Sequence, residues 1–173
     1  MDDELLDLVD GNDNVIGTIN RKDYQRLVDN KLGYIRASEL FIVNDEGRIW
    51  IPVRTATKTI APNGYDCSAA GHVESKDDYL STIIREAEEE IYLHLTPDDL
   101  EFVAKMKSDD VKYFRSIYVL RSNETPAFNT DDFVSAEWLT PDELIENIRN
   151  GHPAKINLAE TATKLKTYLD TKK

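Results

Sequence analysis

The chain has 173 residues, a formal net charge of −12 at pH 7 and 40% hydrophobic residues, enough for one domain with a sizeable core. The negative charge disfavours bulk attraction to a nucleic acid polymer or an anionic membrane, so a phosphate ligand would need a local metal ion or Arg. The acidic start Met1-Asp2-Asp3-Glu4 is unlike a signal peptide, and no apolar run approaches the roughly 18 residues of a membrane span. The single cysteine, Cys67, excludes an intramolecular disulfide. We therefore expect a cytoplasmic protein with a single domain at 1–173.

The first third of the chain predicts two hairpins with a short helix between them. Gly-Asn-Asp-Asn at 11–14 and Asn-Asp-Glu-Gly at 44–47 are both turn sequences between runs of strand-forming residues. After the second hairpin, Thr, Lys, Pro and Gly occur without periodicity, which is typical of a surface loop. In chain order we expect strands at 5–9 and 15–19, a helix at 21–30, strands at 37–43 and 49–53, and a loop at 54–66.

The middle of the chain predicts an amphipathic helix after a run of small residues at 68–71. These small residues leave room for a close backbone approach, to another strand or to a bound ion. Ser75 and Asp78 resemble a weak capping box, so the helix is expected to start near Ser75 or Asp77. Its apolar face is expected to comprise Leu80, Ile83, Ile84, Ala87 and Ile91.

The last third alternates strand and helix patterns. Thr140-Pro141-Asp142-Glu143 combines a Thr cap, Pro at the first helical position and Glu at the third, and therefore predicts a helix start. The expected elements are strands at 101–107, 113–120 and 135–139, a helix from 140 to 150, and a final amphipathic helix carrying Leu158, Ala162, Leu165 and Leu169. Strands with helices between and after them predict an α+β protein with a mixed sheet flanked by helices.

Three glutamates of the central helix form an acidic group. Glu86, Glu89 and Glu90 fall at i, i+3 and i+4, inside an arc of about 100° that points away from the apolar stripe. Such carboxylates repel one another unless a cation lies between them, and Mg²⁺ takes oxygen ligands. Glu is also a good helix former, so an isolated run of this kind is more often a solvated face, as we expect for Glu88.

The spacing around these glutamates resembles the signature of the Nudix hydrolases. That signature is Gly, five residues, Glu, seven residues, then Arg-Glu-aliphatic-any-Glu-Glu-any-Gly-aliphatic. The residues that stand at the required places are Gly71, Arg85, Glu86, Ala87, Glu89, Glu90 and Leu93. Because its fixed positions span 23 residues, the match is specific and favours a metal site over a solvated face.

Two positions depart from this signature. Asp77 replaces the first Glu, which keeps the negative charge on a shorter side chain, so we expect a change in strength and not a loss of activity. Tyr92 replaces the last Gly; a bulky residue at positive φ would cost on the order of 1–3 kcal/mol. We therefore expect the helix to end differently here.

The resemblance extends over most of the chain to the bacterial Nudix branch related to isopentenyl-diphosphate isomerase. It implies an α/β/α sandwich with an amino-terminal extension at 1–33 and a core at 34–173. The isomerases carry a catalytic cysteine just before the Gly-His pair, where this chain has Ala70. They also use a glutamate on the strand after the signature, and 113–120 contains no acid. A hydrolase is therefore favoured over an isomerase, and a non-catalytic nucleotide-binding module is the third hypothesis.

The resemblance implies roles for particular residues. Glu86, Glu89 and Glu90, with the backbone carbonyl of Ala70, would hold Mg²⁺, or Mn²⁺ as the alternative. Arg85 would pair with a carboxylate, often the one at Asp77, and support catalysis together with Glu89 and Glu90. The general base stays open among Glu89, Glu90, Asp109, Asp110 and a later loop acid.

Candidate substrate contacts are Arg54 and Lys58 in the surface loop and His72 beside Gly71. Simple surface charge is an equal alternative for Arg54 and Lys58, and a hydrogen-bonded structural role is the alternative for His72. The expected partner is a small diphosphate compound, such as a nucleoside diphosphate derivative, with no nucleic acid polymer and no membrane. A homodimer through the amino-terminal hairpin is a further hypothesis.

Overall fold

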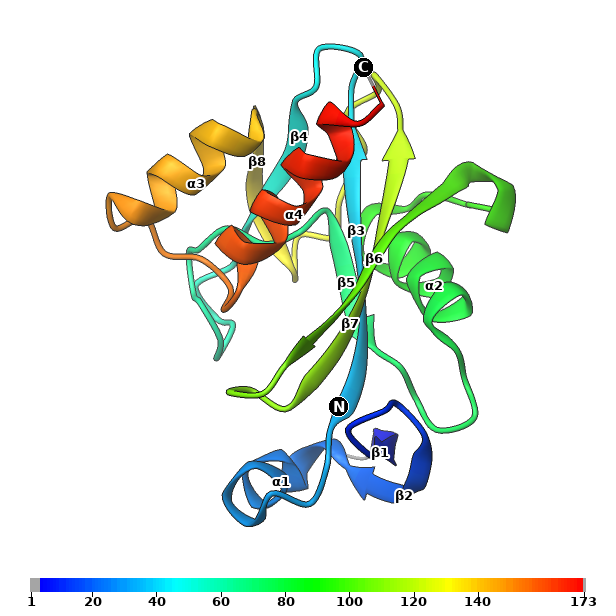
Figure 1. Ribbon diagram of the computed structural model, residues 1–173. Helices are drawn as coiled ribbons and strands as arrows, with labels where there is room; N and C mark the ends of the chain where they lie inside the picture. Colours follow the sequence, from blue (N-terminus) through cyan, green and yellow to red (C-terminus); the bar gives the residue numbers. More distant parts are fainter. Residues whose placement is uncertain (1–3, 173) are drawn as a thin grey trace.

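A mixed sheet organises the computed structural model, which describes residues 4–172 (Figure 1). Its strands are β3 (Ile35–Val43), β4 (Ile49–Arg54), β5 (Ala69–His72), β6 (Leu100–Ser108), β7 (Tyr113–Arg121) and β8 (Phe133–Leu139). The order is β6-β7-β3-β4-β8, and β5 pairs with β3. Within residues 4–172, β3 and β7 pair in parallel, and the other strand pairs of this sheet are antiparallel. The expected mixed sheet is therefore confirmed.

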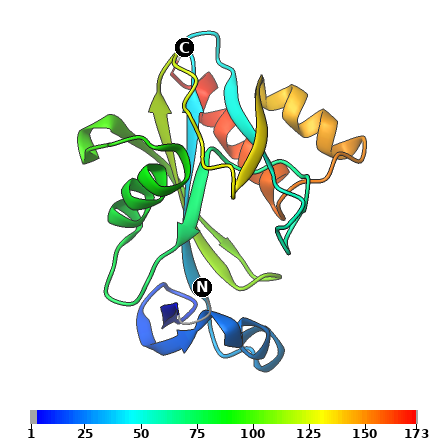
Figure 2. The same cartoon turned by 180° about the vertical axis from the view of Figure 1, so that it is seen from behind.

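Helices cover both faces of this sheet (Figures 1 and 2). On one face lies α2 (Tyr79–Ile91), and on the other lie α3 (Pro141–Arg149) and α4 (Leu158–Asp170). Side chains of a strand point alternately to its two faces, so β3 serves both cores. Leu40 and Ile42 pack in the cluster that contains α2, whereas Phe41 and Val43 pack in the cluster that contains α4.

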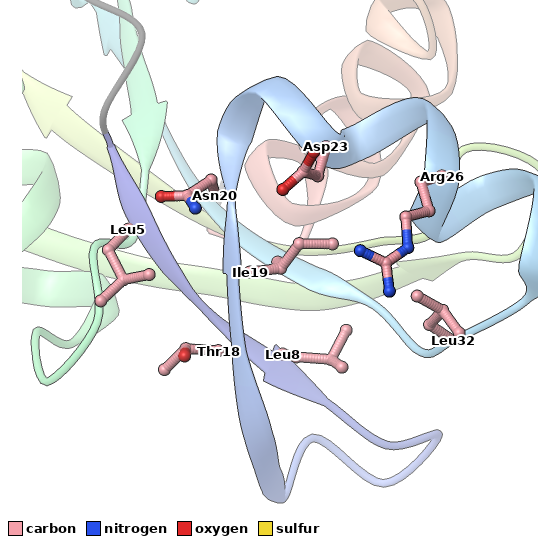
Figure 3. A pocket seen from close by; sticks show the side chains of 8 residues that line it. All are labelled: Leu5, Leu8, Thr18, Ile19, Asn20, Asp23, Arg26 and Leu32. Atoms are coloured by element: carbon pink, nitrogen blue, oxygen red, sulfur yellow. The ribbon is translucent and has the colours of Figure 1, made fainter.

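The amino-terminal part forms a small lobe at one end of β3 (Figure 1). It consists of the hairpin β1 (Leu5–Val9) and β2 (Val15–Asn20), a short 3-10 turn at Arg21–Asp23, and α1 (Tyr24–Asn30). Leu6, Ile19, Leu27 and Ile35 form its core. A pocket of about 290 Å³ lies between the hairpin and α1, and no residue of α2 or β5 lines it (Figure 3).

The expected elements are confirmed along most of the chain, with one additional strand, β5, and a later start of α2. The run of small residues continues into β5, which pairs with β3. The predicted cap at Ser75 is wrong. Asp78 caps α2 and forms a capping box with Ser81, while Ser75 Oγ donates to Asp7 Oδ1 at 2.8 Å. Ser75 therefore ties the segment before α2 to the amino-terminal lobe.

The expectation that α2 ends differently from the signature at Tyr92 is also wrong. Tyr92 has φ 56° and ψ 29°, the left-handed conformation that glycine would adopt more readily. The Tyr92 and Leu93 N–H groups both reach the Ala87 carbonyl, so the cap satisfies an otherwise unpaired helix acceptor. The Tyr92 side chain is 55% exposed and lies clear of the core. The helix thus ends as the signature implies, with a strained residue in place of glycine.

No helix within residues 4–172 has the length and apolar character needed to cross a membrane. The expectation that the chain does not start with a signal peptide depends on the acidic residues at its start. Residues 1–3 of that segment lie outside the described residues.

Candidate active site at the free edge of β5

The free edge of β5 brings backbone groups and the glutamates of α2 together. Ala70 lies opposite Glu39 of β3, and its N–H donates to Glu90 Oε2 at 3.0 Å. In an antiparallel strand the N–H and C=O of one residue point to the same side. The Ala70 carbonyl therefore also points away from β3 and toward the carboxylates of α2.

Gly71 explains how α2 lies so close to β5. A Cβ at this position would lie 2.0 Å from Glu86 Oε1 and 2.1 Å from its Cδ, so the Glu86 side chain occupies the space that any other residue would fill. Glu86 itself is only 9% exposed. The prediction that all three glutamates point away from the buried face is thus wrong for Glu86, because the missing Cβ at Gly71 creates a place for its carboxylate.

Two of the glutamates lie where their charge is poorly solvated. Burial raises the pKa of Glu86 to about 7, against the opposing effect of Arg85, whose Nη1 lies 2.9 Å from Glu86 Oε1. Burial raises the pKa of Glu90 to about 8, and the nearby Asp66 adds to the shift. Both carboxylates would gain from a cation that stabilises the charged form.

Glu89 differs from these two residues. Its side chain is 59% exposed and its Oε2 lies 3.5 Å from Arg85 Nη1. Within residues 4–172 no set of three His, Cys, Asp or Glu side chains is gathered closely enough to hold a metal ion. Glu86, Glu90 and the Ala70 carbonyl nevertheless offer oxygen donors to one region, which suits a hard divalent cation. Glu89 would join them by turning from Arg85.

Arg85 is the cation of this acidic group. It contacts Glu86, Glu89 and Glu74, the last through Nη2 at 3.6 Å. Its Nη2 is buried and makes no hydrogen bond within the described residues. The predicted partner Asp77 instead accepts hydrogen bonds from the hydroxyls of Ser81 and Thr82. Asp77 thus accepts hydrogen bonds from the first turn of α2, and Glu74 contacts Arg85 in its place.

The three candidate substrate contacts already have partners in the protein. Arg54 binds Asp66 and donates to the Ile60 carbonyl at 2.8 Å. Lys58 pairs with Asp132, which holds the surface loop against the segment before β8.

His72 Nε2 lies 2.9 Å from the Tyr113 hydroxyl, and burial lowers the pKa of His72 to about 3. His72 is therefore neutral at pH 7 and cannot act as a cation for phosphate. Of the general base candidates, Asp109 accepts from Tyr34 in the region of the amino-terminal lobe. Burial raises the pKa of Cys67, as expected for a small buried side chain.

On the α4 side of β5 lies a second charged group that the sequence pattern did not reveal. It consists of Glu39, Asp66, Arg115 and Lys155. Asp66 binds Arg54 and lies 3.3 Å from Lys155 Nζ, whereas Glu39 Oε1 lies 3.6 Å from Arg115 Nη1. Glu39 and Arg115 are charged residues within the apolar strands at 35–43 and 113–121. Because buried charges are usually paired, this pattern could have predicted that they contact each other. Asp66 and Lys155 lie in irregular segments and carry no comparable pattern.

Comparison with known proteins places the chain in a family. Residues 33–161 match the NUDIX domain. An uncharacterised Nudix hydrolase of Nostoc is 38% identical over 157 residues, covering 90% of this chain and 91% of the relative. A Nudix hydrolase of Deinococcus radiodurans is 36% identical over 160 residues, or 91% of each chain. The chain belongs to the Nudix family, and both of these relatives are named as Nudix hydrolases.

Solved structures agree with this assignment. The crystal structure of DR0079 from Deinococcus radiodurans has a TM-score of 0.82 at 35% identity, covering 94% of this chain and 99% of that one. The MutT protein of Methanosarcina mazei has a TM-score of 0.59 at 15% identity and covers 82% of this chain and 96% of its own, which shows the shared fold alone. An isopentenyl-diphosphate isomerase of Photorhabdus laumondii is 26% identical, with 85% of each chain covered.

Proposed function

We propose that this protein is a divalent-metal-dependent hydrolase that cleaves the diphosphate linkage of a nucleoside diphosphate derivative or a similar small compound. The observation that carries the proposal is the pair of poorly solvated carboxylates, Glu86 and Glu90, beside the backbone of Ala70 and Gly71. Sites that perturb carboxylate pKa values in this way are typical of catalytic centres. The net charge of −12 supports a small ligand over a nucleic acid polymer.

Each residue has a part in this reaction. Glu86, Glu90 and the Ala70 carbonyl would hold Mg²⁺ or Mn²⁺, with Glu89 added. The metal would neutralise charge on the phosphoryl oxygens and lower the pKa of bound water. Arg85 positions Glu86 through the ion pair between Nη1 and Oε1 at 2.9 Å, and it also contacts Glu89 and Glu74. Glu89, exposed at the rim, can turn toward an incoming water and accept its proton.

An allylic isomerase acting on an isopentenyl diphosphate is the second candidate, because one relative bears that name. Ala70 stands where those enzymes carry cysteine, and Cys67 is buried with its pKa raised, so no thiol is presented at the free edge of β5. Incubation with isopentenyl diphosphate and Mg²⁺ should give no dimethylallyl product. Clear formation of that product would replace the hydrolase proposal.

A panel of nucleoside diphosphates, nucleotide sugars and dinucleoside polyphosphates, assayed with Mg²⁺ and Mn²⁺ for release of phosphate and nucleotide, tests the hydrolase. Glu90→Gln should lower turnover by at least ~100-fold, the usual scale for loss of a positioned acid or base. The matched control is Glu88→Gln, since Glu88 is an exposed glutamate of the same helix that pairs with His94. Equal activity of both variants would remove the metal-site assignment. Metal binding without any turnover would favour a binding module.

A further inference from the structure

Lys155 brings a positive charge to the same edge of β5 from the opposite side. Its Nζ lies 3.3 Å from Asp66 Oδ1, and its side chain is 30% exposed. The positive charge of Lys155 also attracts the carboxylates of Glu39 and Glu90, so it acts on acids of both groups. Among the glutamates of α2, Glu90 is the one on which this cation acts, and Glu90 is a proposed metal ligand.

The backbone around Lys155 is fixed to the segment that leads into β5. Lys155 N donates to the Tyr65 carbonyl at 2.9 Å, and Tyr65 N donates to the Pro153 carbonyl at 2.9 Å. The rings of Tyr65 and His152 stack with centroids 3.7 Å apart. A Cβ at Gly64 would lie 2.8 Å from the Pro153 backbone, so the close approach of the two segments depends on glycine. The position of the Lys155 backbone is thus fixed by contacts with the segment that leads into β5.

The head group of Lys155 differs from the guanidinium groups nearby. Arg54 donates to Asp66 and the Ile60 carbonyl, and Arg115 donates to Thr161, Ser108 and Glu160. Lys155 Nζ has an ion pair with Asp66 but no hydrogen bond to any of residues 4–172. An ammonium group has three donors, so Lys155 can face Asp66 with one of them and still offer a donor to a ligand. The Lys155 side chain as a whole is 30% exposed, so part of it is open to solvent.

We propose that Lys155 is a phosphate-binding residue of the active site, whose ammonium donates to a non-bridging oxygen of the bound diphosphate. This inference rests on the proposed function for the position of the substrate, and adds a residue outside the Nudix signature. In the absence of substrate, Asp66 holds the ammonium beside the site. A compact ammonium on a flexible stem can change from the carboxylate to the phosphate without movement of the backbone.

The test uses methylenediphosphonate with Mg²⁺, a diphosphate analogue that cannot be hydrolysed at its bridge. Binding is measured by titration calorimetry for the wild-type chain and for Lys155→Met, which keeps the length of the stem and removes the charge. Because hydrogen bonds to charged groups are strong, Lys155→Met should weaken binding by about 10- to 100-fold, and Lys155→Arg should recover part of it. Lys164→Met, at an exposed position of α4, is the control and should bind as the wild type does.

A second measurement separates contact with the ligand from a structural role. Acetylation of Lys155 by acetic anhydride, followed by mass spectrometry, should fall several-fold when Mg²⁺ and methylenediphosphonate are added, while acetylation of Lys164 stays constant. Equal affinity of Lys155→Met and wild type, or equal acetylation with and without the probe, would overturn the proposal. Failure of the wild-type protein to bind methylenediphosphonate with Mg²⁺ would also overturn the proposal. Binding that depends on Lys155 in a protein without hydrolysis would support this inference and contradict the proposed hydrolase.

Discussion

Asp66 and Glu90 are two acids on opposite sides of the β5 edge, and their pKa values move in opposite directions. Burial acts to raise both values, but Lys155 and Arg54 hold the pKa of Asp66 below its ordinary value. Glu90 has the Ala70 N–H as its hydrogen-bond donor, and burial raises the pKa of Glu90 to about 8. The α4 side of the edge is therefore supplied with cations by the protein itself. On the α2 side Arg85 pairs with Glu86, and burial still raises the pKa of Glu86 and Glu90, so we propose that a metal ion supplies the further positive charge.

The comparison indicates that buried acids on the α4 side of β5 stabilise the fold, whereas those on the α2 side are candidates for a role in catalysis. Asp66 is 3% exposed, binds Arg54, and accepts from the Cys67 N–H at 2.8 Å, so its charge is part of the folded structure. Glu86 has one close guanidinium, which also contacts Glu89 and Glu74. Removing charge should thus destabilise the α4 side and leave the stability of the α2 side almost unchanged.

The largest effect is expected for Arg115→Met, which removes the cation beside Glu39. Arg115 is 4% exposed and also donates to Thr161, Ser108 and Glu160. Breaking a buried pair leaves an uncompensated group, so the free energy of unfolding should fall by about 3–5 kcal/mol in urea denaturation. Arg149→Met, at an exposed position of α3, should stay within about 0.5 kcal/mol of wild type. Comparable values for the two variants would mean that the α4 side does not depend on its charge pairs.

A smaller loss of about 2 kcal/mol is expected for Asp66→Asn at pH 7, because hydrogen bonds to Arg54 and the ion pair with Lys155 lose their charge. The folded-state pKa of Asp66 is depressed, so its contribution is present above its unfolded pKa, near 4, and is lost as pH falls through the folded pKa. The deficit of Asp66→Asn should therefore shrink below about pH 4. Urea denaturation of both proteins from pH 3 to pH 7 measures it, and a deficit that grows on acidification would contradict the assignment.

The smallest effect on stability, less than about 1 kcal/mol, is expected for Glu86→Gln without metal. Burial of this carboxylate already disfavours its charge, so the amide should be tolerated in the same space. The functional effect should be large, since Mg²⁺ should raise the melting temperature of the wild type and much less that of Glu86→Gln. Differential scanning calorimetry with and without Mg²⁺ compares them. A strong loss of stability without metal would show that the two sides of the edge are alike.

Much of the fold could be predicted from the sequence because local patterns agree with tertiary packing. Thr140 caps α3 and pairs with Glu143 as the pattern indicates, and strand-forming runs give β3, β4 and β7. The candidate site could be predicted only in part. Gly71, Arg85 and the glutamates of α2 follow from fixed spacing along one segment. The assignments to Arg54, Lys58 and His72 as substrate contacts stay predictions, and each has a protein partner in the structure.

The sequence by itself determined the Nudix signature, the helix that carries it and the order of strands and helices, because these depend on residues close together in the chain. Only the tertiary structure decided which carboxylates are compensated. Glu90 meets Ala70 across 20 positions and Lys155 meets Asp66 across 89, and no local pattern reports such distant neighbours. The physical reason is that the charge of an acid is set by burial and by the cations around it, and both arise only when β5, α2 and the segment before α4 come together.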